Sequence, residues 1–270
     1  MKTFVTRALV KMAIALASPS SAYAHAQAEL HTFHCLHGCP VGAPAIDDII
    51  VREIYTLASN DLTKMADWVA YRVTPKSIGP SGDRKWQADP WLDPAEALEP
   101  ADYDGAPRAL GIDRGHQAPL AAFSGTPFAP DTNILSNITP QGAPLNQAPW
   151  QRLEARETAL AKSDNIAVYV VTGPLFERVM PALPKADERH RVPSAYWKVI
   201  ATADGRMAAF VMDTAASRAL DHCDARVSLD EVELRSRLLL FPRLADRRFT
   251  DLSSALGCEA TAAPSPEPDE

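Results

Sequence analysis

Residues 111–154 read GIDRGHQAPLAAFSGTPFAPDTNILSNITPQGAPLNQAPWQRLE and hold an imidazole, arginines, carboxamides and carboxylates within one short stretch. Glycines and prolines separate these side chains, and there is little apolar periodicity that would bury them, which is typical of a functional site. The tetrapeptide Asp113–His116 alone is weak evidence, because a histidine beside a glycine is more often an ordinary surface or core residue. The order of His116, Asn137, Asn146 and Glu154 carries the prediction.

The segments around this stretch predict an α+β fold with a central antiparallel sheet flanked by helices. Runs rich in β-branched and aromatic residues indicate strands, whereas Ser228, with Glu231 three residues later, is typical of a helix start. Prolines between residues 74 and 110 indicate long loops, which in a compact domain are usually functional. The expected strands are 49–57, 68–73, 166–172, 197–202 and 207–213, with a hairpin turn at 203–206, and the expected helices are 150–162 and 228–239.

The N-terminus has the pattern of a secretory signal over residues 1–24. Its positive charges precede a short apolar run, and small residues offer cleavage after Ala24 or Ala26. The run is too short to span a bilayer, so we expect no membrane association after cleavage, and a secreted or periplasmic protein. Residues 25–261 are expected to form one domain, and the acidic, proline-rich residues 262–270 a disordered tail.

The net charge of −7 becomes −10 when Lys2, Arg7 and Lys11 leave with the signal, which opposes a nucleic-acid partner. A local cleft rather than net charge decides binding. Cationic side chains near the proposed site predict a positive groove on an acidic body: Arg84, Lys85, Arg108 and Arg114.

In these motifs the chain resembles the DNA/RNA non-specific endonucleases of the ββα-metal (His-Me finger) superfamily, particularly the secreted Serratia-type branch. The resemblance extends from the CLHGCP segment at 35–40 through WVAY at 68–71, DRGHQAP at 113–119, VTGPL at 171–175 and PSAYWK at 193–198 to Cys258. It therefore covers nearly all of the mature chain. It implies a ββα-metal active-site motif and, as an assembly that the residues do not decide, a homodimer.

The resemblance implies hydrolysis of single- and double-stranded DNA and RNA with one Mg²⁺ ion per site, Mn²⁺ being a substitute, and 5′-phosphate products. His116 would be the general base, and a neutral imidazole suits this task. Asn146 would be the direct ligand of the ion, which keeps most of its water. Contacts to phosphate and metal alone predict little sequence specificity. The other implied residues are Glu154 as acceptor for water on the ion, Arg84 and Arg114 on phosphate oxygens, and Asn137 near the scissile phosphate.

Local features refine these roles. Gly115 is expected to let the chain turn and Asp113 to fix that turn. Pro149 requires a helix that begins near residues 145–146, so that the proline falls in the first turn. At the position where the family often has another substrate-side arginine this chain has Thr158, and Arg156 would lie on a different face.

Four cysteines in an exported chain predict two disulfides. Cys35 and Cys39 are close in sequence, and the family pattern carries cystines both there and at Cys223 and Cys258. A zinc site at Cys35, Cys39, His34 and His37 is the open alternative.

Two other functions compete with the nuclease. One is a catalytically silent nucleic-acid-binding protein of the same fold, which the intact set of site residues argues against. The other is a serine or zinc hydrolase, for which the chain lacks the Gly-x-Ser-x-Gly and His-Glu-x-x-His motifs.

Overall fold

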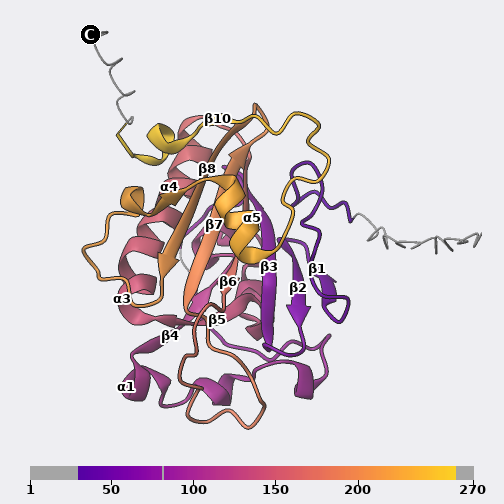
Figure 1. The fold of residues 1–270 in the computed structure, drawn as a ribbon, viewed down its shortest axis with the longest axis vertical. Helices are drawn as coiled ribbons and strands as arrows, with labels where there is room; N and C mark the ends of the chain where they lie inside the picture. Colours follow the sequence, from indigo (N-terminus) through magenta and orange to yellow (C-terminus); the bar gives the residue numbers. More distant parts are fainter. Residues whose placement is uncertain (1–29, 81, 260–270) are drawn as a thin grey trace, which may run out of the picture.

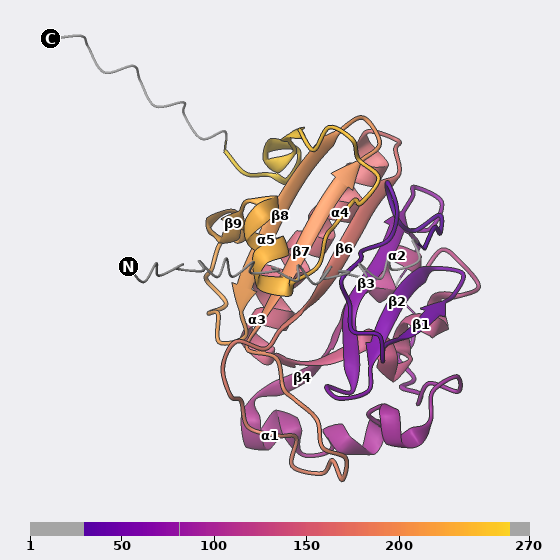
Figure 2. The same ribbon diagram turned by 45° about the vertical axis from the view of Figure 1, so that its right-hand side comes forward.

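A twisted sheet runs through the centre of the molecule and carries helices on both faces (Figures 1 and 2). The structure is a computed structural model that describes residues 30–80 and 82–259, so the expected signal and tail lie outside the described residues. The sheet order is β1-β2-β3-β6-β7-β8-β10, with β9 also paired to β8; all pairs are antiparallel except β10 with β8. The strands are β1 (Asp48–Val51), β2 (Tyr55–Asn60), β3 (Met65–Val73), β6 (Val168–Leu175), β7 (Ala195–Thr202), β8 (Arg206–Asp213), β9 (Arg226–Val227) and β10 (Thr250–Asp251).

The α+β class, the antiparallel sheet and the 203–206 hairpin are confirmed, but the strand expected at 49–57 is two strands. The chain reverses after Val51, where the amide of Arg52 donates to the carbonyl of Tyr55 at 2.9 Å. The guanidinium of Arg52 is buried in an ion pair with Asp89 at 2.6 Å, which anchors the turn. Only the charged pair Arg52–Glu53 marks this break in the sequence, and the apolar residues on either side read as one strand.

Alternation along the central strands gives the sheet two buried faces. Tyr196 and Ile200 of β7 face one core cluster, whereas Trp197 and Val199 face the other. Helix α4 (Gln151–Ser163) covers the first face, and α5 (Leu229–Ser236) covers the second (Figures 1 and 2). Every residue of β7 is therefore buried.

Short helices occupy segments where prolines had indicated loops. Pro94, Pro100 and Pro107 each stand in the first turn of one of them, where a missing amide hydrogen costs nothing. Helix α5 begins as expected, with Ser228 accepting from the amide of Glu231, but it ends at Ser236 because Arg237 is left-handed. Apart from the segment that follows β5, the other helices are η1 (Pro94–Glu96), η2 (Pro100–Tyr103), α1 (Ala106–Leu110), α2 (Leu120–Phe123), η3 (Ala129–Asn133), η4 (Leu135–Asn137), η6 (His222–Ala225) and η7 (Ser253–Leu256).

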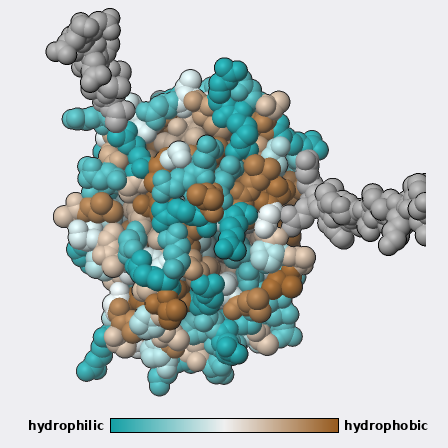
Figure 3. All heavy atoms as spheres, viewed as in Figure 1, coloured by the Kyte–Doolittle hydropathy of each residue, from teal (hydrophilic) through white to brown (hydrophobic). Residues whose placement is uncertain are grey.

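Both expected disulfides are present, Cys35–Cys39 and Cys223–Cys258, so the zinc alternative is wrong. On the face drawn in Figure 3, hydrophilic and hydrophobic residues are interspersed. None of the described helices is both long and apolar enough to cross a bilayer.

A second, two-stranded sheet stands beside the main one and leads into the site. Strand β4 (Ile112–His116) pairs antiparallel with β5 (Ile138–Gly142), and β5 continues directly into α3 (Ala143–Leu145), the π-helical segment η5 (Asn146–Trp150) and α4. The amide of Gly142 donates to Oγ1 of Thr214 at 3.2 Å, and a side chain at residue 142 would overlap the carbonyl of Thr214. Only glycine therefore allows this approach to the start of the helix.

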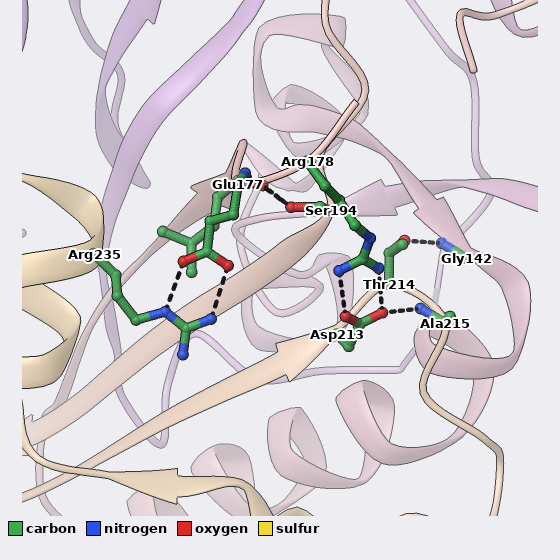
Figure 4. Close-up of polar contacts among 9 residues, drawn as sticks. Gly142, Glu177, Arg178, Ser194, Asp213, Thr214, Ala215 and Arg235 are labelled. Carbon is green, nitrogen blue, oxygen red and sulfur yellow. Dashed lines mark hydrogen bonds and ion pairs between the residues drawn. The ribbon is translucent and has the colours of Figure 1, made fainter. Parts of the chain in front are cut away.

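The loop after β6 is tied to the main sheet close to that point. Figure 4 shows Glu177 facing Arg235 of α5 and Arg178 facing Asp213 at the end of β8, in pairs of 2.6–2.9 Å. Thr214, which meets Gly142, follows Asp213 directly. The two-stranded sheet is thus attached to the main sheet where the site helix begins.

Candidate active site

A cleft of about 740 Å³ lies where β4 meets the helix that follows β5. Five of the six predicted site residues line it: Arg84, Arg114, His116, Asn146 and Glu154. They come from a loop, a strand and a helix. The pairing of β4 with β5 brings the strand residues and the helix residues together.

His116 is the last residue of β4, and its ring is held on two sides. Its Nε2 lies 3.0 Å from Oδ1 of Asn133, and its ring centroid lies 5.3 Å from that of Trp86. Because a carbonyl oxygen can only accept, Nε2 carries the proton and Nδ1 remains the acceptor. Burial lowers the pKa of His116 to about 4; the Asn133 bond opposes this shift and the charge of Arg84 adds to it. The imidazole is therefore neutral at ordinary pH.

Gly115 does not have the expected role of turning the chain. It lies inside β4 with ordinary strand geometry, and a Cβ there would meet Oε1 of Gln141 at 2.5 Å. The glycine leaves room for a buried glutamine of the partner strand. His116 reaches the cleft from a strand end, not from a turn.

Asp113 also differs from expectation, since it fixes no turn. Its Oδ2 accepts from Nδ2 of Asn146 at 3.0 Å and from Nε2 of Gln147 at 2.7 Å. This orients the amide of Asn146 and leaves its carbonyl oxygen without a hydrogen bond from the described residues.

The helix that carries Asn146 begins at Ala143, not at 145–146, and Pro149 lies inside it. The π-helical turn Asn146–Trp150 accommodates the proline. Over residues 146–154 an uninterrupted α-helix turns about 800°, which would leave Glu154 about 80° from Asn146. A π-turn contains one residue more than an α-turn, so the helix rotates about 100° less between Asn146 and Glu154 than an α-helix would. The two residues then lie only about 20° apart around the helix axis. The bulge therefore brings both side chains to the same cleft.

The arginines line the cleft differently. Arg84 is exposed, whereas Arg114 donates to the carbonyl of Pro100 at 2.7 Å and lies over the rings of Tyr103 and Trp86. Thr158 lines the cleft, and Arg156 instead lies against Gly257. The expected separation of these two residues is confirmed.

Asn137 is the predicted site residue that the structure places behind the cleft. It is fully buried, donates to the carbonyls of Ala118 and Thr132 at 2.9 Å, and accepts from the amide of Ala118 at 2.8 Å. Its amide joins the segments that follow His116 and precede Asn133. It is thus placed to hold the histidine and its hydrogen-bond partner in register.

Comparison with known proteins agrees with this geometry. A family model described as DNA/RNA non-specific endonuclease matches residues 38–247. The chain belongs to this family. The nuclease of Serratia marcescens is 45% identical over 240 residues, covering 86% of this chain and 90% of that protein. Human mitochondrial endonuclease G is 31% identical over 223 residues, covering 76% and 73%.

A solved structure supports the same fold. The crystal structure of the EndoG/EndoGI complex matches with a TM-score of 0.66 at 26% identity, covering 77% of this chain and 91% of that chain. The protein is accordingly a nuclease of the ββα-metal fold, a family whose members use a divalent metal and act on nucleic acid.

The oxygen atoms of the nuclease cleft fit a hard divalent cation. The carbonyl oxygen of Asn146 is available, and Oε1 of Glu154 is buried without a hydrogen-bond partner. Burial raises the pKa of Glu154 to about 7; the charge of Lys198 counteracts this shift and that of Glu157 adds to it. A carboxylate oxygen without a hydrogen-bond partner and a free amide oxygen in the same cleft suit Mg²⁺ or Mn²⁺ better than a softer metal.

Sequence reasoning missed two supports of the nuclease site. Asn133 stands in the same polar stretch as Asn137, and nothing in the sequence alone separates their roles. Lys198 was identifiable in principle, because a lysine within the apolar AYWKVIAT of β7 must be buried. Its partners come from a different strand and a helix, which only the tertiary structure reveals.

Proposed function

We propose that the chain is an exported, Mg²⁺-dependent endonuclease that hydrolyses phosphodiester bonds of single- and double-stranded DNA and RNA to 5′-phosphate products. The observation that carries this proposal is the neutral, oriented ring of His116 in one cleft with Asn146 and Glu154. Its single-domain extent is proposed as residues 25–261. The homodimer stays a prediction that sedimentation equilibrium would test.

The residues divide the chemistry between them. Nδ1 of His116 accepts a proton from the attacking water, while Asn133 keeps the other nitrogen protonated. Asn146 would hold the ion directly and Glu154 would hold it through ordered water. When bound, the ion supplies charge neutralisation at the phosphate and the departing oxygen. Arg84 and Arg114 donate to phosphate oxygens.

The decisive experiment compares the purified mature protein with His116→Ala on circular plasmid and on RNA. We expect the parent to cleave both in Mg²⁺ and neither in EDTA, and the variant to lose several orders of magnitude of kcat/KM. His190→Ala is the matched control, because that histidine bonds to Leu183 and Glu188 outside the cleft. Equal cleavage by His116→Ala and parent would reject the assigned base, and binding without cleavage by the parent would favour the silent alternative.

Export is proposed from the N-terminal pattern and is supported by the two disulfides. The location would be extracellular or periplasmic. Sequencing the N-terminus of protein recovered from the periplasm or medium should find cleavage after Ala24 or Ala26. An intact N-terminus on active protein would contradict this part of the proposal.

A further inference from the structure

A buried lysine lies behind the wall of the cleft that carries Glu154. The side chain of Lys198, in the middle of β7, is fully buried. Its Nζ lies 2.8 Å from Oε1 of Glu157, 3.2 Å from the hydroxyl of Tyr71 and 3.7 Å from Oε1 of Glu154, and it faces the ring of Trp150 at 4.6 Å. A buried ammonium is costly unless such partners satisfy it.

The charges in this cluster do not balance. Glu157 is fully buried and doubly satisfied, since its other oxygen accepts from Tyr71 at 2.8 Å. Glu154 has only the longer contact to the ammonium, its Oε1 has no hydrogen-bond partner, and its side chain is 17% exposed. When Glu154 is ionised, one positive charge thus stands against two carboxylates. The surplus negative charge lies on the residue that borders the cleft.

We propose that Lys198 is a positioning residue that sets how tightly the nuclease holds its divalent cation. Shared between Glu157 and Glu154, the ammonium fixes Glu154 at the cleft wall and offsets part of its charge. Glu157, on the same helix, makes the shorter contact with the ammonium of Lys198. Glu154 therefore keeps enough negative charge to attract the ion. The opposing ammonium makes this binding weaker than it would be at a carboxylate with no cation nearby. This inference rests on the proposed function, because it concerns the same metal site.

Two variants separate this role from ordinary structural support, because they shift cation affinity in opposite directions. In Glu157→Gln, Glu154 becomes the nearest carboxylate to Lys198, so the affinity for the divalent cation should fall at least threefold. In the double variant Lys198→Met/Glu157→Gln, the opposing ammonium is gone while Glu154 remains, so affinity should rise at least threefold. The double variant avoids leaving Glu157 buried without a counter-charge, as Lys198→Met alone would do. Lys162→Met, the control, removes an exposed lysine from α4 and should leave the cation affinity unchanged.

The measurement is binding of Mn²⁺ to the full mature protein without nucleic acid, followed by loss of the free-ion EPR signal, with melting temperature as a folding check. Opposite shifts in the two variants support the inference. Equal affinities, weaker binding in both, or no Mn²⁺ binding by the parent at millimolar concentration overturn it. Because no substrate is present, this result is independent of the plasmid assay, whose failure would reject the proposed function instead.

Discussion

Replacing Asn133 by aspartate puts a carboxylate where an amide oxygen now accepts the proton of His116. The two atoms are 3.0 Å apart. At an effective dielectric constant of 20, opposite unit charges at that distance attract by about 5.5 kcal/mol, equivalent to about four pKa units. The new carboxylate is itself buried, since residue 133 is 1% exposed, and its desolvation opposes the gain. We therefore expect the commonly observed rise of about 1–3 units.

The substitution should raise the pKa of His116. The pKa of His116 is about 4 in the parent and should rise to between about 5 and about 7 in Asn133→Asp. The ring would then be protonated at mildly acidic pH, so activity should fall there more than at pH 8. The ¹H–¹³C signals of labelled histidine across a pH titration measure the pKa directly.

Gln117→Ala is the matched control for that experiment. Gln117 is also a buried amide and follows His116 in sequence, but its Nε2 donates to the carbonyl of Ala66 at 3.2 Å. It should lower the melting temperature without moving the His116 titration. A His116 pKa in Asn133→Asp that stays at or below about 4 would refute the assigned contact and the tautomer derived from it.

A pH profile tests the ionisation of Glu154, and three further substitutions test other parts of the molecule. Because the pKa of Glu154 is raised to about 7 and its ionised form is needed, metal-limited kcat/KM should fall as pH falls through about 7, a bend that Glu154→Gln should abolish. Gly142→Ala should push the start of the site helix away from the carbonyl of Thr214 and weaken Mn²⁺ binding at least tenfold. Unchanged binding would show that the close contact between residues 142 and 214 is dispensable. Thr158→Arg adds a cation to the cleft and should lower KM for plasmid and steepen its salt dependence, whereas an unchanged salt slope would argue that residue 158 does not meet phosphate. Replacing Cys223 and Cys258 by serine should cost about 4 kcal/mol of unfolding free energy in the chain-entropy account of a bridge with sequence separation 35, measured by urea denaturation; a loss under about 1 kcal/mol would contradict that account.

Local signals in the sequence located α4, the start of α5 and most of the main-sheet strands. The Ser228 cap, the 203–206 turn and the alternation in β7 and β8 depend on neighbouring residues, and the structure confirms them. The break between β1 and β2 was missed because a remote ion pair of Arg52 anchors it. The prolines at 94, 100 and 107 indicate loops in the sequence, whereas their position in a helical first turn depends on the residues that follow.

Residue identity and order by themselves determined the family, the disulfide cysteines and the side chains available for catalysis, since chemical type is a property of each residue. The tertiary structure decided which nitrogen of His116 is free, because Asn133 must approach it through space. It also decided that Asn137 lies behind the cleft, that a π-turn aligns Asn146 with Glu154, and that a lysine of β7 stands behind them. Hydrogen bonding and burial act between segments distant in sequence, so those assignments required the fold.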